Sequence, residues 1–267
     1  MVKGISVKFK TYQESVPAIL KVIKLEEELK NHNTLILKPA LKHAYAKNTE
    51  VALTEEVLKF CLQNKAPGSR IFIAEGADGD DTDEVFDIFG YKKLAEKYSI
   101  GLIDLNSAEF EEIVDDEFQR FDRIVFPKLL LDSFIISIVP LAEDEETDIY
   151  GSLANMLGAF PSEHYSGFFS RGKNKIRKWP IKYSIHDILK CKMPNLAIID
   201  AADKGMLLAG QPLEMDKQAA KILGKDWRQI GHLRLADDSF ANYKPSQPKA
   251  KEKSDIPEMD VSEDNTK

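Results

Sequence analysis

The chain has 267 residues, 43% of them hydrophobic and 30% charged, which is ordinary for a globular protein. Its formal net charge of -7 disfavours general attraction to nucleic acid or to an anionic membrane. The two cysteines, Cys61 and Cys191, form no C-x-x-C pair, so no iron–sulfur cluster or structural zinc site of the usual spacing is expected. The first residues lack the apolar core of a secretory signal, and the longest apolar stretch, Leu129–Ala142, is too short to span a bilayer. We therefore expect a cytoplasmic protein.

Apolar runs of strand length alternate with segments of helical periodicity. The predicted strands, in chain order, are Ile5–Phe9, Thr34–Leu37, Arg70–Ala74, Gly101–Leu105, Arg123–Phe126, Phe134–Val139, Leu196–Ile199 and Met206–Leu208. Several are continuous β-branched or aliphatic runs, which is typical of strands buried on both faces. The alternation predicts an α/β fold with a mainly parallel sheet, helices on both faces and a Rossmann-like layered architecture.

Helix boundaries between these strands can be predicted from capping residues. The expected caps are Ser15, Thr54, Asp81 and Ser107 at helix starts and Gly224 at a helix end. Asp81 is followed three residues later by Glu84, which is the spacing of a capping box.

The composition changes from about Tyr243 onward, where prolines interrupt a mixed-charge run with almost no large apolar residues. Such a run buries too little apolar surface to offset the entropy of ordering it. We expect residues 1–242 to form a single α/β body, or two subdomains that meet near 140–160. We expect residues 243–267 to form a disordered tail.

Three loops that follow predicted strands begin with a charged residue, namely Lys38, Glu75 and Asp200. Ligands of an open parallel sheet bind beyond the carboxyl ends of its strands, so we expect these residues to line the same edge of one sheet. Lys38 would bind an anionic group, and Glu75 would orient the ligand or a divalent ion. Asp200 would act as a catalytic group on a ligand hydroxyl or a metal-bound water. The alternatives are a solvated lysine and carboxylates that cap the following turns.

The acidic loop after Glu75 offers further oxygen ligands. Glu75, Asp78 and Asp80 are candidate metal ligands, and a divalent cation is the one cofactor considered. The loop does not fit the EF-hand pattern, because Asp83 stands where glycine is needed and Phe89 where the bidentate glutamate belongs. The acidity also has a structural explanation, since carboxylates favour the helix start that follows.

Residues 158–182 combine aromatic side chains with six basic residues, which are Arg171, Lys173, Lys175, Arg177, Lys178 and Lys182. Loops of this length are uncommon in compact domains and are often functional. Arg171 and Lys173 would hold an anionic small molecule, with His164 as a catalytic proton donor. The alternatives are a solvated charged surface and a contact with phosphodiesters.

Common catalytic motifs are absent from the sequence. It contains no G-x-G-x-x-G after a predicted strand, no P-loop, no G-x-S-x-G and no H-E-x-x-H. The usual dinucleotide-binding, nucleotide triphosphatase, esterase and zincin functions are therefore not supported.

Several segments follow one another in a recognisable order and spacing. They are Leu35–Pro39, the helix at Thr54, Glu75-Gly76 with Thr82, Phe86–Leu94, Leu153–Gly158, His164, Pro194–Asp200 and the helix Asp216–Gly224. Together they resemble the domain-of-unknown-function-362 family over nearly all of residues 34–236. The resemblance implies an α/β fold and a candidate cleft rather than a particular activity, with a remote fold-level similarity to lactate-racemase-type proteins, whose nickel-pincer motif has no match here.

The chain departs from that family at three places. Ala142–Glu146 replaces a lysine–histidine pair after the central strand, and Ala154 replaces a lysine. The ferredoxin-type cysteine clusters that many relatives carry are missing. These departures leave two functional hypotheses open.

The first hypothesis is a cleft that binds, and in an enzyme would also transform, an anionic small molecule. Its residues are Lys38, Glu75, Asn155, His164, Arg171, Lys173 and Asp200. The second hypothesis is a catalytically silent interaction module that uses the basic residues of 158–182 and the tail. Convergence of the named side chains would favour the first hypothesis, and scattering would favour the second.

Overall fold

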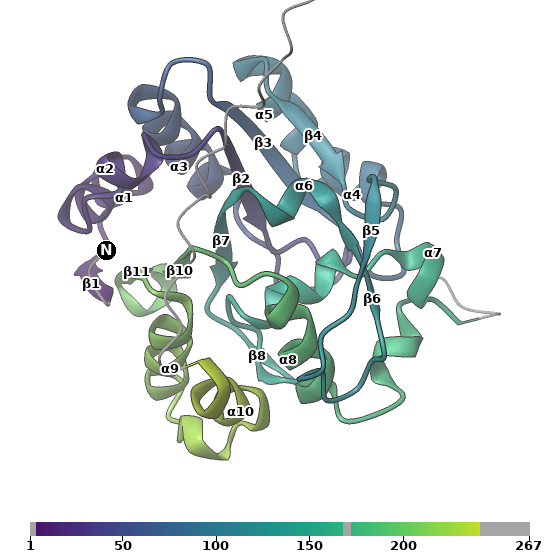
Figure 1. The fold of residues 1–267 in the computed structure, drawn as a ribbon. Helices are drawn as coiled ribbons and strands as arrows, with labels where there is room; N and C mark the ends of the chain where they lie inside the picture. Colours follow the sequence, from purple (N-terminus) through teal and green to yellow (C-terminus); the bar gives the residue numbers. More distant parts are fainter. Residues whose placement is uncertain (1–3, 168–171, 241–267) are drawn as a thin grey trace, which may run out of the picture.

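The computed structural model describes residues 4–167 and 172–240 of the protein. A seven-stranded sheet in the order β1-β11-β10-β7-β2-β3-β4 runs through the molecule, with helices on both sides (Figure 1). Its strands are β1 (Gly4–Lys8), β2 (Thr34–Pro39), β3 (Arg70–Glu75), β4 (Gly101–Asp104), β7 (Phe134–Pro140), β10 (Leu196–Ala201) and β11 (Met206–Gly210). Only β11 runs antiparallel to its neighbours, so the predicted mainly parallel α/β sheet is confirmed.

The continuous apolar runs have a direct structural cause. All seven residues of β7 are buried, because this strand lies in the interior of the sheet between β10 and β2. Along β2, Ile36 packs in one hydrophobic cluster while Leu35 and Leu37 pack in the other, on the opposite face. Burial on both faces thus removes the polar alternation of a half-exposed strand.

Two small antiparallel ribbons lie outside the main sheet. They pair β5 (Phe110–Ile113) with β6 (Ile124–Pro127) and β8 (Glu143–Asp144) with β9 (Asp148–Ile149). The predicted helix after Ser107 is therefore wrong. Ser107 lies in a turn, where its hydroxyl donates to Asp104 at 3.2 Å, and strand β5 follows.

Helices cover both faces of the sheet. The α-helices are α1 (Tyr12–Val22), α2 (Leu25–Leu29), α3 (Val51–Asn64), α4 (Thr82–Ile88), α5 (Tyr91–Tyr98), α6 (Lys128–Leu131), α7 (Ser162–Tyr165), α8 (Ile181–Cys191), α9 (Pro212–Ile222) and α10 (Gly231–Phe240). The 3-10 helices are η1 (Ala154–Ala159), η2 (Asn174–Arg177), η3 (Ala202–Lys204) and η4 (Trp227–Gln229). Helices α1 to α5 supply one hydrophobic cluster, and η1, α8, α9 and α10 supply the other. Within the described part of the chain, no helix is long and apolar enough to cross a membrane.

Besides Ser107, two of the predicted caps are wrong, and the other two are confirmed. Thr11, not Ser15, caps α1, and Thr54 lies inside α3, which begins three residues earlier. Thr54 faces the core, where its hydroxyl lies 3.0 Å from that of Tyr91. Asp81 caps α4 by accepting from the N–H groups of Asp83 and Glu84, and Gly224 ends α9 with a φ of 74°. The tail predicted over 243–267 lies outside the described residues.

Candidate functional site

The strand order places a topological switch point between β2 and β7. From β2 the chain builds outward through β3 and β4, and from β7 it builds the other way through β10. The connections on the two sides of this point diverge, which leaves room for a ligand above the carboxyl ends of the strands. Lys38, the next-to-last residue of β2, lies beside Ser137 of β7 at this position.

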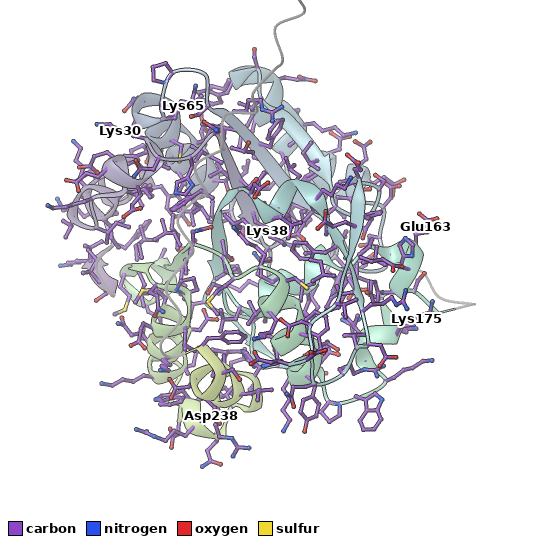
Figure 2. The ribbon with its side chains drawn as sticks, in the orientation of Figure 1. Lys30, Lys38, Lys65, Glu163, Lys175 and Asp238 are labelled. Carbon is purple, nitrogen blue, oxygen red and sulfur yellow. The ribbon has the colours of Figure 1, made fainter. Side chains whose placement is uncertain are left out.

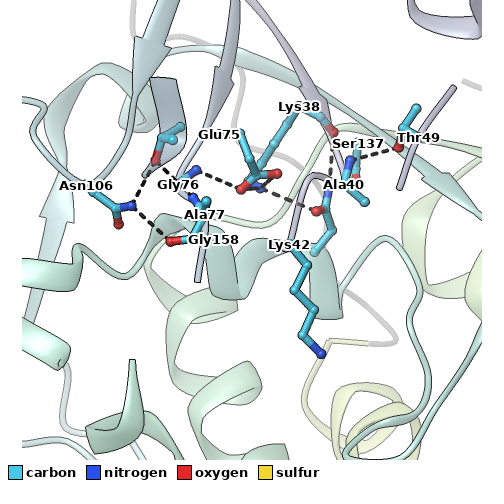
Figure 3. Close-up of polar contacts among 12 residues, drawn as sticks. Lys38, Ala40, Lys42, Thr49, Glu75, Gly76, Ala77, Asn106, Ser137 and Gly158 are labelled. Carbon is cyan, nitrogen blue, oxygen red and sulfur yellow. Dashed lines mark hydrogen bonds and ion pairs between the residues drawn. The ribbon is translucent and has the colours of Figure 1, made fainter. Parts of the chain in front are cut away.

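Lys38 forms a buried ion pair with Glu75, the last residue of β3. Its ammonium group donates to the two carboxylate oxygens of Glu75 at 2.7 and 2.8 Å (Figure 3). It also lies 3.4 Å from Oδ1 of Asn155. The Lys38 side chain is fully buried and that of Glu75 is 3% exposed. Burial lowers the pKa of Lys38, and Glu75 opposes that shift. The two charges tolerate burial because each has its partner within hydrogen-bonding distance.

Asn155 connects the two strands at the switch point. Its side-chain amide donates to the carbonyl oxygen of Lys38 and to the hydroxyl of Ser137, both at 3.0 Å. Asn155 comes from η1, which lies across the carboxyl ends of β2 and β7. The crevice expected at the switch point is therefore filled by η1 in this structure.

A buried carboxylate on α9 orients the start of η1. Asp216 accepts from the N–H and hydroxyl groups of Ser152, at 2.7 and 2.8 Å, and from the N–H of Leu153 at 2.9 Å. A Cβ atom on Gly151 would lie 2.5 Å from this carboxylate, so only glycine fits at this position. Burial raises the pKa of Asp216 to about 6, against the effect of its three donors.

Lys173 is a second buried lysine beside the ion pair. Its ammonium group donates to the carbonyl oxygens of Gly76 at 2.7 Å and Gly158 at 3.0 Å, so it links the end of β3 to η1. The residue is 1% exposed, and burial lowers its pKa to about 8. A Cβ on Gly158 would lie 2.0 Å from Oε1 of Glu75, so η1 approaches the pair as closely as a backbone can. Glu75 pairs with Lys38, and the charges of Glu75 and Asp78 both oppose the lowering of the Lys173 pKa.

A small cavity of about 10 Å³ lies next to this cluster, close to the ~10–15 Å³ that one water molecule needs. It is lined by Lys42, Glu75, Gly76, Asp78, Tyr150, Leu157, Gly158 and Arg177. Lys42 pairs with Asp144 at 2.9 Å, and Arg177 pairs with Asp78 and Glu146 at 2.6 and 2.8 Å. Burial raises the pKa of Tyr150 well above its usual value, so this residue offers the cavity a protonated hydroxyl.

The structure brings four of the predicted site residues together, which are Lys38, Glu75, Asn155 and Lys173. It does not bring in His164, which is exposed on α7 with its ring edge-on to Phe110. Figure 2 shows Glu163, its neighbour, at the rim of the molecule and Lys38 near the middle. Arg171 lies outside the described residues.

Asp200 ends β10 on the expected edge, but its side chain belongs to the other face of the sheet. Its carboxylate accepts from the hydroxyl of Tyr12 on α1 at 2.6 Å and from the N–H of Ala202 at 3.0 Å. Ile198, two residues earlier, packs in the cluster opposite to that of Ile36 and Ala40, which flank Lys38. Asp200 therefore secures α1 to the sheet and does not reach Lys38.

The three candidate metal ligands do not converge. Glu75 is paired with Lys38, Asp78 with Arg177, and Asp80 is exposed and accepts from the N–H of Ala44 at 2.9 Å. Across residues 4–167 and 172–240, no group of three or more histidine, cysteine or acidic side chains is placed to hold a metal ion.

Sequence reasoning missed Lys42, Tyr150, Arg177 and Asp216. Asp216 had a readable signal, because Leu213, Asp216 and Ala220 share one buried helical stripe, and an acid on such a stripe needs an internal partner. Arg177 was counted among the basic residues of 158–182 without a place in the cleft, and Lys42 lies in the loop that follows the predicted strand Thr34–Leu37. Neither has a local pattern that assigns it to the cavity.

The sheet order and the polar cluster above its switch point define an open-sheet α/β protein of the layered, Rossmann-like class. The family model described as Domain of unknown function (DUF362) matches residues 20–224, and the chain belongs to this family. The resemblance predicted from the sequence is thereby confirmed.

The comparison with solved structures supports the fold and nothing further. No curated protein matches the chain. Among solved structures, the lactate racemase apoprotein from Thermoanaerobacterium thermosaccharolyticum is similar, with a TM-score of 0.51 and 13% sequence identity over 86% of this chain. The match covers 58% of that racemase, so this chain spans little more than half of its length.

Proposed function

We propose that the chain is a cytoplasmic protein that binds a small anionic molecule above the carboxyl ends of β2 and β3. The observation that carries this proposal is the charge of the inner cluster, where Lys38 and Lys173 are both buried. Glu75 pairs with Lys38, whereas the ammonium group of Lys173 has no ion-pair partner among the described residues and donates to carbonyl oxygens instead. A buried ammonium group without its own counter-ion is costly, and an anion that reaches it is attracted far more strongly than in water.

The hydrogen-bonding capacity of the two lysines supports the same conclusion. The three N–H groups of Lys38 have three acceptors, in Glu75 and Asn155. Lys173 has two acceptors among the described residues, the carbonyl oxygens of Gly76 and Gly158, so one of its donors is left for a ligand. Lys173 is therefore the residue that we assign to the anion.

The rim of the cavity would complete the binding site. Lys42 and Arg177 supply further cations, and Tyr150 supplies a hydroxyl donor. The cavity holds about one water molecule, so any larger ligand must widen it. A lysine with a pKa near 8 is also suited to accept or donate a proton near neutral pH, which makes Lys173 the candidate acid–base group in place of His164.

The test is thermal unfolding at constant ionic strength with potassium lactate, acetate or phosphate, each compared with chloride. Lactate is included because the similar solved structure is named a lactate racemase. At least one oxyanion should raise Tm, since a ligand at 100 times its Kd stabilises the folded state by about 2.7 kcal/mol. Lys173→Met should abolish the shift and Lys42→Met should reduce it.

Lys30→Met is the matched control, because Lys30 is exposed and lies at the edge of the molecule, away from Lys38 (Figure 2). It should keep the full shift. If every oxyanion behaves as chloride does, or if the Lys173 and Lys42 variants keep the shift, the proposed function is wrong and the silent interaction module is the better hypothesis.

A further inference from the structure

The surface next to η2 carries an exposed tryptophan among basic side chains, which we name the tryptophan patch. It consists of Arg120, Lys178, Trp179, Lys182 and Tyr183. Trp179 is 60% exposed, and the guanidinium group of Arg120 lies 5.8 Å from the centre of its ring. Lys182 stands over the ring of Tyr183 at 4.9 Å. An exposed tryptophan beside arginine is typical of residues that dominate protein interfaces.

The patch is held in shape by α8. Asp187, which is fully buried on that helix, accepts from the backbone N–H groups of Gln119, Arg120 and Phe121 at 2.7, 2.7 and 3.1 Å. The Arg120 side chain is thereby placed over both Phe121 and Trp179. The surface is therefore preorganised, which lowers the entropy cost of binding a partner.

The cations of the patch are not neutralised within the described part of the chain. There, Lys178 and Lys182 form no ion pair, and Arg120 donates only to the carbonyl oxygen of Lys175 while its Nε is buried without an acceptor. A positive, aromatic surface in a chain of net charge -7 fits a segment that is acidic and carries apolar side chains.

We propose that residues 255–267 of the same chain dock on the tryptophan patch. This segment has five acidic residues and one lysine, with Ile256, Met259 and Val261 between them. The acidic side chains would pair with Lys178, Lys182 and Arg120, and the apolar ones would cover the indole ring of Trp179.

The chain can reach the patch. Phe240, the last described residue, has its ring 5.4 Å from that of His186, one helical turn along α8 from Lys182. The 14 residues from 241 to 254 span up to about 45 Å when extended, far more than the ~6 Å between those two positions on α8. A tether of this kind gives an effective concentration in the millimolar range, so a weak contact is enough for docking.

The experiment uses tryptophan fluorescence in a Trp227→Phe background, which leaves Trp179 as the only tryptophan. The full chain is compared with a chain that ends at Ser254. Removal of residues 255–267 should shift the emission of Trp179 to longer wavelength and increase its quenching by acrylamide. The variant Lys178→Glu/Lys182→Glu should cause the same changes in the full chain and none in the shortened one, while Lys30→Glu should cause none in either.

A charge-reversal pair distinguishes docking from a general effect of charge. Asp255→Lys/Glu258→Lys should release the segment alone and restore protection when combined with Lys178→Glu/Lys182→Glu. The proposal fails if removal of the segment leaves the spectrum unchanged. It also fails if protection depends on protein concentration, which indicates a second copy, or if a single-stranded oligonucleotide binds equally well with and without the segment.

Discussion

The buried cluster makes an asymmetric prediction about its two ion-pair partners. Lys38→Met leaves Glu75 with Lys173 close by and with the N–H of Gly76, which donates to Glu75 Oε1 at 2.8 Å. Glu75→Gln instead leaves the ammonium group of Lys38 buried without its ion-pair partner and removes the largest charge that opposes the lowering of the Lys173 pKa. We therefore expect Glu75→Gln to destabilise the fold more than Lys38→Met does.

The magnitudes follow from the burial of both side chains, which are 0% and 3% exposed. Breaking a buried pair by removing one partner costs about 3–5 kcal/mol, so we expect about 3 kcal/mol for Lys38→Met and about 5 kcal/mol for Glu75→Gln. The double variant Lys38→Met/Glu75→Gln should cost less than the sum of the two, because no lone charge of the pair remains.

The assay is urea unfolding at pH 7, followed by far-ultraviolet circular dichroism, with the midpoint compared at unchanged m-value. Lys97→Met is the control, because Lys97 pairs with Glu55 at 2.7 Å on the surface, and it should leave the midpoint nearly unchanged. Equal losses for the two single variants, or a larger loss for Lys38→Met, would refute the view that the charge of Glu75 acts on Lys173 as well as on Lys38.

Two further predictions concern pH. Lys173 loses its proton near pH 8 when folded and near pH 10.4 when unfolded, so the free energy of unfolding should rise across that interval, and Lys173→Met should lack that part of the rise. Asp216 has a pKa of about 6 when folded and about 3.9 when unfolded, so its contribution to stability is present below pH 4 and lost as the pH rises to about 6. Asp216→Asn should remove this loss, and it should lower the midpoint at all pH values because an amide cannot accept from all three donors; unchanged urea midpoints across pH 4–6 in the parent chain would contradict the assignment.

Much of the fold could be predicted because burial on both faces marks the strands so clearly. Phe134–Val139 is an uninterrupted apolar run, and the structure buries every residue of β7. The helix starts were harder, because Ser15 and Thr54 carry capping side chains but lie on buried stripes, where they make internal hydrogen bonds. Residue type alone does not separate a cap from a buried hydroxyl.

The site could be predicted only where it depends on strand ends. Lys38 and Glu75 were found in this way, since neighbouring parallel strands bring their ends together. The prediction that Asp200 lies with Lys38 was wrong, because the position of a residue at a strand end gives the edge of the sheet and not the face. The face depends on the register of the strand. Lys173 was expected to hold an anion together with Arg171, with a solvated surface as the alternative. No local pattern indicates that its stem turns inward to reach two carbonyl oxygens more than ten residues away.

At three glycines of the site the backbone passes very close to an oxygen atom, and this limits how the sequence can evolve. Gly76, Gly151 and Gly158 would each place a Cβ within 2.5 Å of a carbonyl or carboxylate oxygen. Every substitution of these glycines by another amino acid adds a side chain, so selection should hold all three residues fixed. Lys42, Tyr150 and Arg177, which line the cavity, are under no such steric limit. New ligand preferences would therefore arise by substitution of these cavity-lining side chains, while the three glycines stay the same.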